Sequence, residues 1–144
     1  MSPRRREVPL PKGAVGTVVF DTGALDKVAE GDEVARAVWR RLVGAGWHSL
    51  LPSVVLAETI TGRPRDARID RVIGSIGAPA NPDEGIARRA GALRFRAEHA
   101  APSGIDALVA AHAAHSTPSV VLTGDPDDLS ALLTNIAQAR VIGV

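Results

Sequence analysis

The segment SVVLTGDPDDL, residues 119–129, places three carboxylates within four positions directly behind a short apolar run. The β-branched run SVVL predicts a buried strand at 119–122, because strands covered on both faces are continuously apolar. Pro126 is a favoured first residue of a helix, and the pattern predicts one from there to about Ala137. Helix capping and the binding of a cation each explain acids at such a place, so the remaining sequence has to distinguish them.

Elsewhere in the sequence, short β-rich runs alternate with longer helical patterns. Strands are predicted at 17–20 (TVVF) and 48–51 (HSLL), with a further short one at 77–80 and a last one at 140–144 (RVIGV). Predicted helices cover residues 22–29, 32–44, 53–61, 83–100 and 104–116, and another begins at Pro64. Strands that alternate with helices predict one α/β domain with a mainly parallel sheet, covered by helices on both faces.

The composition excludes several classes of protein. The 144 residues include no cysteine, which excludes disulfides, thiol catalysis and cysteine-based zinc sites and fits a reducing, cytoplasmic location. No apolar run is long enough for a membrane span, and prolines interrupt the segment MSPRRREVPLPKG, so it does not form the apolar core of a signal peptide. We therefore expect a flexible extension at 1–16, followed by a single domain at 17–144.

The basic residues are nearly all arginines, and they are balanced by acids. Lys12 and Lys27 are the only lysines among 17 basic residues, and the net charge is +1, which argues against a uniformly basic surface around a polyanion. Arginine binds phosphate bidentately. The arginines at 36–41, 63–71 and 88–96 are therefore candidates for phosphate contacts, although such charges often belong to solvated helix faces.

Two acids follow predicted strands, and two more lie in predicted helices. Asp21 comes directly after TVVF, and Asp125 follows SVVL by two residues, so a parallel sheet brings both to one edge. Glu58 is predicted among apolar neighbours, where an unpaired carboxylate is costly. Asp106 has a strong local explanation, because Ser103 and Asp106 fit a capping box. Asp125 and Asp128 fit the same kind of cap.

The four acids together are harder to explain than any one of them. Carboxylates that lie within a few ångströms repel each other, so one must take a proton or a cation must neutralise them. Hard divalent cations with oxygen ligands are the natural counterions. The set therefore predicts a site for Mg²⁺ or Mn²⁺ at the carboxyl ends of the strands.

Four motifs in this order resemble the PIN-domain ribonucleases, and most closely the VapC-type toxins of VapBC toxin–antitoxin modules: VVFDTGAL, LPSVVLAET, GIDALVAAHA and VVLTGDPDDL. The likeness covers Thr17 to Val144 and implies a three-layer α/β/α PIN-like domain. It assigns catalytic and metal-binding roles to four acids and supporting roles to two further residues. The four acids are Asp21, Glu58, Asp106 and Asp125, and the supporting residues are Asp128 and Thr123.

The resemblance further implies an endoribonuclease that depends on Mg²⁺ or Mn²⁺, acts as a homodimer and is held inactive by a VapB-type antitoxin. Its substrate would be RNA, cleaved at phosphodiester bonds. The open alternatives are a stand-alone PIN nuclease that cuts DNA or RNA without an antitoxin, and a non-catalytic PIN-fold binding module. The four histidines form no zinc pattern, and His112 and His115 are expected in packing or on the surface.

Overall fold

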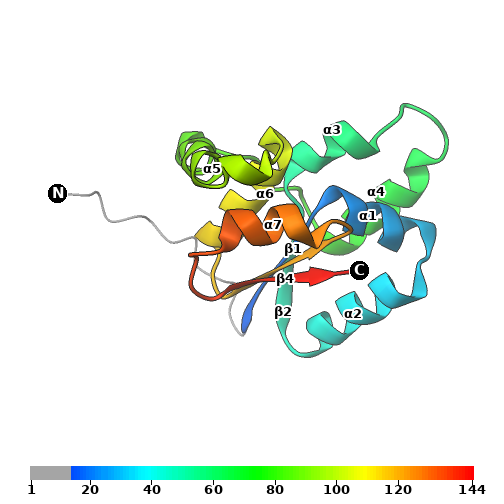
Figure 1. Cartoon of the computed structure of the whole chain (residues 1–144). Coiled ribbons are helices and arrows are strands. Elements are labelled where there is room, and N and C mark those ends of the chain that lie inside the picture. The colour runs from blue at the N-terminus through cyan, green and yellow to red at the C-terminus, as the bar shows by residue number, and fades with distance from the viewer. Residues whose placement is uncertain (1–13) are drawn as a thin grey trace.

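The computed structural model describes residues 14–144 (Figure 1), so most of the predicted extension lies outside the described residues. The strands are β1 (Gly16–Phe20), β2 (Trp47–Leu50), β3 (Ser119–Thr123) and β4 (Ala139–Gly143). The helices are α1 (Thr22–Glu30), α2 (Glu33–Gly44), α3 (Leu56–Thr59), α4 (Asp66–Ile76), α5 (Glu84–Arg96), α6 (Gly104–His115) and α7 (Pro126–Leu133). Two 3-10 turns, η1 (Ser53–Val55) and η2 (Glu98–Ala100), lie before α3 and after α5.

The four strands form one parallel sheet in the order β2-β1-β3-β4. β1 and β3 are its central strands and are buried at every position, as their continuous apolar runs predicted. They pair in register, with Phe20 opposite Leu122. The chain leaves β1 towards β2 and leaves β3 towards β4, so the connections diverge between the two central strands. In open parallel sheets such a point is where ligands bind.

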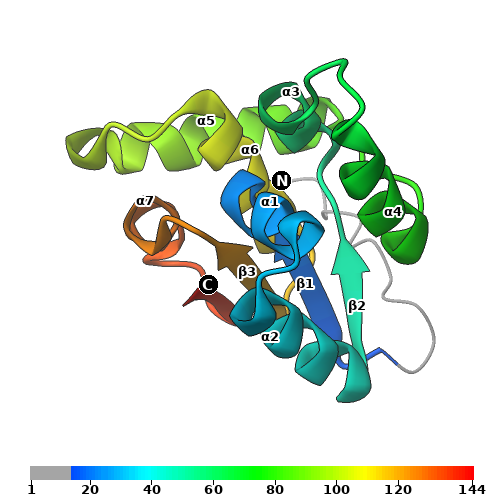
Figure 2. The ribbon, with the colours of Figure 1, turned by 90° about the vertical axis from the view of Figure 1, so that its right-hand side faces the viewer.

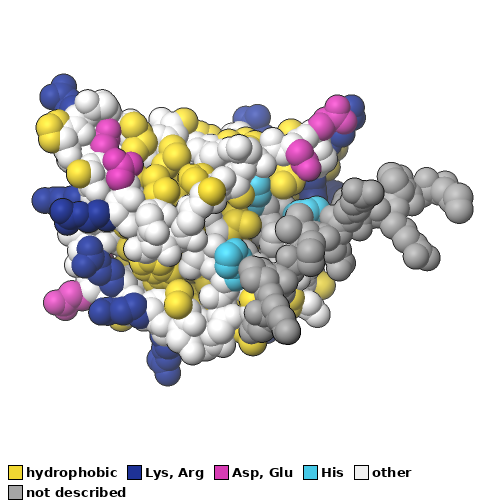
Figure 3. Space-filling view, turned by 180° about the vertical axis from the view of Figure 1, so that it is seen from behind, with side chains coloured by type: hydrophobic (Ala, Val, Ile, Leu, Met, Phe, Trp, Pro, Cys, Tyr) yellow, Lys and Arg dark blue, Asp and Glu magenta, His cyan; other side chains and the backbone are white. Residues whose placement is uncertain are grey.

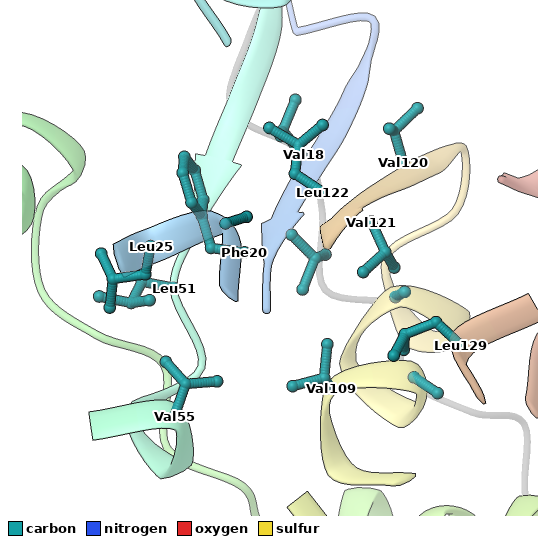
Figure 4. Packing of buried hydrophobic residues seen from close by; sticks show 14 of the residues in the cluster. Val18, Phe20, Leu25, Leu51, Val55, Val109, Val120, Val121, Leu122 and Leu129 are labelled. Carbon is teal, nitrogen blue, oxygen red and sulfur yellow. The ribbon is translucent and has the colours of Figure 1, made fainter. Parts of the chain in front are cut away.

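Helices cover the sheet on both faces. Figure 2 shows α1 and α2 in front of the strands and α6 behind them. α6 packs against β1, β3 and α7, while α1 packs against α2, α4 and the end of β3. Apolar side chains from both layers meet the sheet in one core (Figure 4), whose largest fully buried members are Phe20, Leu25, Leu51, Leu122 and Leu129. The predicted α/β fold with a parallel sheet is confirmed.

The predicted strand at 77–80 is reduced to one bridge. Ala80 pairs with Pro52, through hydrogen bonds from Ala80 N–H to Leu51 O and from Ser53 N–H to Ala80 O, both 2.8 Å. Prolines at 52 and 79 lack the N–H that a longer ladder needs. The sheet of the described residues therefore has four strands.

Several helices are shorter than their patterns predicted. The helix expected from Pro64 begins at Asp66, because the Asp66 carboxylate accepts hydrogen bonds from Thr61 and Gly62 and folds the intervening segment into a turn. The helix expected over 53–61 ends at Thr59, and the helix expected to reach Ala137 ends at Leu133. Among the described residues, no helix has the length and apolar character needed to cross a membrane.

Candidate active site

Asp21 and Thr123 stand side by side where β1 and β3 end. The Asp21 N–H donates to Leu122 O (2.9 Å) and extends the strand ladder by one residue. The Thr123 hydroxyl, which is fully buried, donates to Asp21 Oδ2 at 2.7 Å. The same hydroxyl accepts a hydrogen bond from Asp125 N–H (3.0 Å). Thr123 thus connects the two acids that the strand ends were predicted to bring together.

Asp21 is a buried carboxylate, with 5% of its surface exposed. Burial is the main reason why its pKa is raised above the ordinary value. Hydrogen bonds from Thr123 and from the Thr22 N–H (2.8 Å to Oδ1) oppose the shift, while the negative charges of Asp106 and Glu58 add to it. Asp21 therefore lies within electrostatic reach of two of the other predicted acids.

Glu58 is close to Asp21, but for a different reason from the one expected. The Glu58 side chain is exposed. The neighbouring Thr59 is fully buried, and its hydroxyl donates a hydrogen bond to Val55 O (3.2 Å). The prediction that Glu58 lies among apolar neighbours was wrong. Instead, Glu58 Oε1 accepts a hydrogen bond from the Thr22 hydroxyl at 3.0 Å. The turn that joins β1 to α1 therefore holds Glu58.

Thr22 is a residue of this site that the sequence prediction missed. Its N–H contacts Asp21 and its hydroxyl contacts Glu58, so one residue positions two carboxylates. The available signal was the dipeptide Asp-Thr directly after a buried strand, where a hydroxyl at the first helical position is free to reach another element.

Asp106 has the predicted local role and also faces the cluster. Ser103 Oγ accepts from Asp106 N–H (3.0 Å), and Asp106 Oδ2 accepts from Ser103 N–H (3.4 Å), which completes a capping box at the start of α6. The half-buried Asp106 also raises the pKa of Asp21 and of Asp128 through its charge. Capping and membership of the acidic cluster are thus compatible.

The segment 125–128 differs from the predicted cap. Asp125 occupies the N-cap position of α7, but its side chain caps no backbone N–H, so the expected capping box between Asp125 and Asp128 is wrong. Reduced hydration, followed by the charges of Asp125, Asp106 and Asp127, raises the pKa of Asp128. Asp127 itself is exposed. The exposed Asp125 carboxylate is therefore not used by the helix that it precedes.

The donor set fits a hard divalent cation in kind, because all of the acids offer oxygen ligands. Their arrangement in the structure is less complete. Within the described range, no three His, Cys, Asp or Glu side chains lie close enough together to hold a metal ion. Binding an ion through three of these carboxylates therefore requires their side chains to come closer together than they are in this structure.

Comparisons with known proteins support the fold. No family model and no curated protein sequence matches this chain. A chain in the crystal structure of VapBC2 from Rickettsia felis, bound to a DNA fragment from its promoter, is similar with a TM-score of 0.68 and 14% identity, over 89% of this chain and 98% of that one. A chain of FitAcB from Neisseria gonorrhoeae is similar with a TM-score of 0.64 and 19% identity, over 88% and 96%.

A member of the VapBC family of toxin–antitoxin systems from Mycobacterium tuberculosis, VapBC-5, is similar with a TM-score of 0.55 and 22% identity, over 90% of this chain and 99% of that one. At these identities the likeness concerns the fold. The predicted PIN-like α/β/α architecture is confirmed at that level, and the described fold spans almost the full length of the neighbours' chains.

Proposed function

We propose that this protein is a metal-dependent endoribonuclease and the toxin of a VapBC-type toxin–antitoxin pair. The observation that carries the proposal is the gathering of Asp21, Glu58, Asp106, Asp125 and Asp128 at the edge where β1 and β3 end. The same fold occurs in crystal structures of VapBC complexes. Acids that hold Mg²⁺ or Mn²⁺ suit phosphodiester hydrolysis, and RNA is the proposed substrate because the sequence motifs resemble those of the PIN-domain ribonucleases.

The proposed roles of the acids differ according to their surroundings. Asp21, Asp106 and Asp125 would hold the metal, which supplies a more acidic bound water and stabilises charge on the phosphate. Glu58, exposed and oriented by Thr22, would bind the metal or orient the water. Asp128 adds negative charge beside Asp125 and Asp106. Thr123 fixes Asp21 and the backbone of Asp125, so it acts as a positioning residue.

A cognate antitoxin would inhibit the enzyme by neutralising this edge. The resemblance to VapBC modules implies that the antitoxin places a basic side chain among the four acids. Its positive charge would take the place of the metal, and the antitoxin segment would block the substrate from the site. We also propose a homodimer in the cytoplasm as the active form. A stand-alone nuclease on DNA or RNA, or a non-catalytic binding module, remain the competing outcomes of the experiment below.

The decisive experiment incubates the purified protein with RNA and with DNA in Mg²⁺, in Mn²⁺ and in EDTA. We expect cleavage of RNA in either metal, none in EDTA, and none by Asp21→Asn. Asp127→Asn is the matched control, because it removes the same charge from an exposed residue of the neighbouring helix. Cleavage that survives in EDTA or in Asp21→Asn would contradict the active-site assignment. Cleavage of DNA alone would favour the stand-alone nuclease.

A further inference from the structure

A concave site lined by arginines lies apart from the acidic edge, where α1, α2 and α4 meet. It encloses about 290 Å³, with Val28 and Ala29 of α1 and Val72 of α4 among its apolar walls. Four arginines surround it. Arg36 and Arg40 come from α2, and Arg68 and Arg71 come from α4. We refer to this cavity as the arginine pocket.

The helical period explains why both pairs face the same space. Arg36 and Arg40 are four residues apart and Arg68 and Arg71 three, spacings that place side chains on one face of a helix. All four arginines are exposed, and none forms an ion pair with another residue of the described range 14–144. Figure 3 shows the basic side chains gathered along the side of the molecule formed by α2 and α4. The pocket therefore gathers four arginines that form no ion pair among the described residues, although Asp26 and Glu30 line a smaller hollow beside Arg68.

Part of the pocket is held in place before anything binds. Arg36 Nε donates to Val28 O at 2.9 Å, which fixes its guanidinium at the rim and leaves its terminal nitrogens available. Trp39 also lines the pocket, with its Nε1 bonded to Ser49 Oγ (2.9 Å) and its ring at right angles to Phe20, centroids 5.3 Å apart. A fixed cationic fork beside a fixed apolar surface suits a ligand with an anionic head and a flat or apolar body.

We propose that the arginine pocket binds a nucleotide unit of the RNA substrate, with the phosphate on the arginines and the sugar and base against Trp39 and Val72. This inference rests on the proposed nuclease function. The volume is at the small end of ligand sites, which suits a single small unit such as one nucleotide. α1 connects the two places, because Asp21 caps its start and Val28 lines the pocket about 10 Å further along.

The test measures equilibrium binding of a fluorescein-labelled, 12-nucleotide single-stranded RNA in EDTA, on an Asp21→Asn background so that cleavage plays no part. We expect Arg68→Ala with Arg71→Ala to weaken binding roughly tenfold and to lower the slope of log affinity against log salt by about one to two. Arg68→Lys with Arg71→Lys keeps the charge but loses the bidentate forks, so we expect an intermediate affinity. Thermal unfolding of each variant confirms that it is folded.

The matched control is Arg96→Ala with Arg140→Ala, which removes the same two charges from exposed positions of α5 and β4, outside the pocket and without an ion pair among the described residues. Equal loss in the control, or unchanged RNA binding by the pocket variant, overturns the inference. The inference is also overturned if the parent protein binds a polyglutamate peptide and the pocket variant no longer does, while the variant's affinity for RNA is unchanged. The pocket would then be a site for an acidic protein segment. In these cases metal-dependent cleavage by the wild type still supports the nuclease. A wild type that neither binds nor cleaves RNA contradicts both proposals.

Discussion

The Thr123 hydroxyl donates a 2.7 Å hydrogen bond to Asp21 Oδ2 across the ends of the two central strands. It is a buried donor, and it opposes the rise in the Asp21 pKa that burial causes. The Thr123 hydroxyl oxygen also accepts a hydrogen bond from the Asp125 N–H at 3.0 Å. One side chain therefore links the ionisation of the acid that follows β1 to the position of the acid that follows β3.

We predict that Thr123→Val raises the pKa of Asp21 further and leaves Asp125 N–H without its acceptor. The loss of these buried hydrogen bonds should lower the free energy of unfolding by about 1–3 kcal/mol. Because the ionised form of Asp21 is the one that binds a cation, the acidic limb of the cleavage pH profile should move to higher pH. Thr123→Ser retains the hydroxyl and should behave like the wild type in urea unfolding and in the pH profile.

We predict that Asp21→Asn abolishes cleavage and yet stabilises the metal-free protein. The folded-state pKa of Asp21 is raised, so its stabilising protonated form is present at low pH and is lost as the pH rises through that pKa. At neutral pH the charge is therefore a net cost, which the amide removes. Thermal unfolding in EDTA at pH 7 should show a higher Tm for Asp21→Asn, by about 2–4 °C for each kcal/mol gained.

The matched control for that prediction is Asp127→Asn, since Asp127 is exposed. It should leave the Tm nearly unchanged. Added Mg²⁺ should raise the Tm of the wild type and not that of Asp21→Asn, because only a protein that binds the ion is stabilised by it. A lower Tm for Asp21→Asn in EDTA would contradict this account of the buried charge.

The strand ends could be predicted because they follow from local patterns and a topological rule. TVVF and SVVL are continuous apolar runs, and parallel central strands end at the same edge, so Asp21 and the segment after Thr123 had to approach each other. The position of Asp106 also followed from local chemistry, because Ser103 and Asp106 satisfy each other at the start of α6. In these places local preference and tertiary structure agree.

The errors arose where tertiary contacts override the helical period. The segment at 53–59 starts as a 3-10 turn, which shifts the buried face from Glu58 to Thr59. Asp125 does not cap α7: its backbone has φ −131° and ψ 84°, outside the extended region that the capping residues Asp21, Asp83 and Ser103 adopt, and its N–H donates to Thr123, a contact that no local pattern reveals. The arginine pocket was equally inaccessible, because it depends on how α1, α2 and α4 meet.

We predict that acid destabilises the protein through His112. This histidine is 3% exposed, its Nε2 has no hydrogen-bond partner among the described residues, and burial lowers its pKa from 6.5 to about 4. The unfolded chain therefore takes up the proton first as the pH falls from about 6.5 to about 4, and stability declines across that window. The loss between pH 7 and pH 5 should be about 2 kcal/mol in urea unfolding.

His112→Leu should remove most of this pH dependence, because leucine fills the buried position without titrating. His48→Gln is the control, since His48 is exposed on β2 and should keep the wild-type slope. If His112→Leu loses as much stability as the wild type between pH 7 and pH 5, other groups cause the acid sensitivity.

The final prediction concerns the close approach of Gly23 to Gly124 beside the acids. A Cβ at Gly23 would lie 3.1 Å from the Gly124 backbone nitrogen and Cα, whereas a Cβ at Gly124 would lie 3.5 Å from Gly23 Cα, an ordinary contact. Gly23→Ala should therefore push the Gly124–Asp125 backbone away from Asp21 and weaken Mg²⁺ binding, measured by calorimetry and by the metal dependence of cleavage. Gly124→Ala, which adds the same methyl group from the other side of the contact, should be far milder in both assays. Equal effects of the two substitutions would show that this contact does not set the separation of the acids.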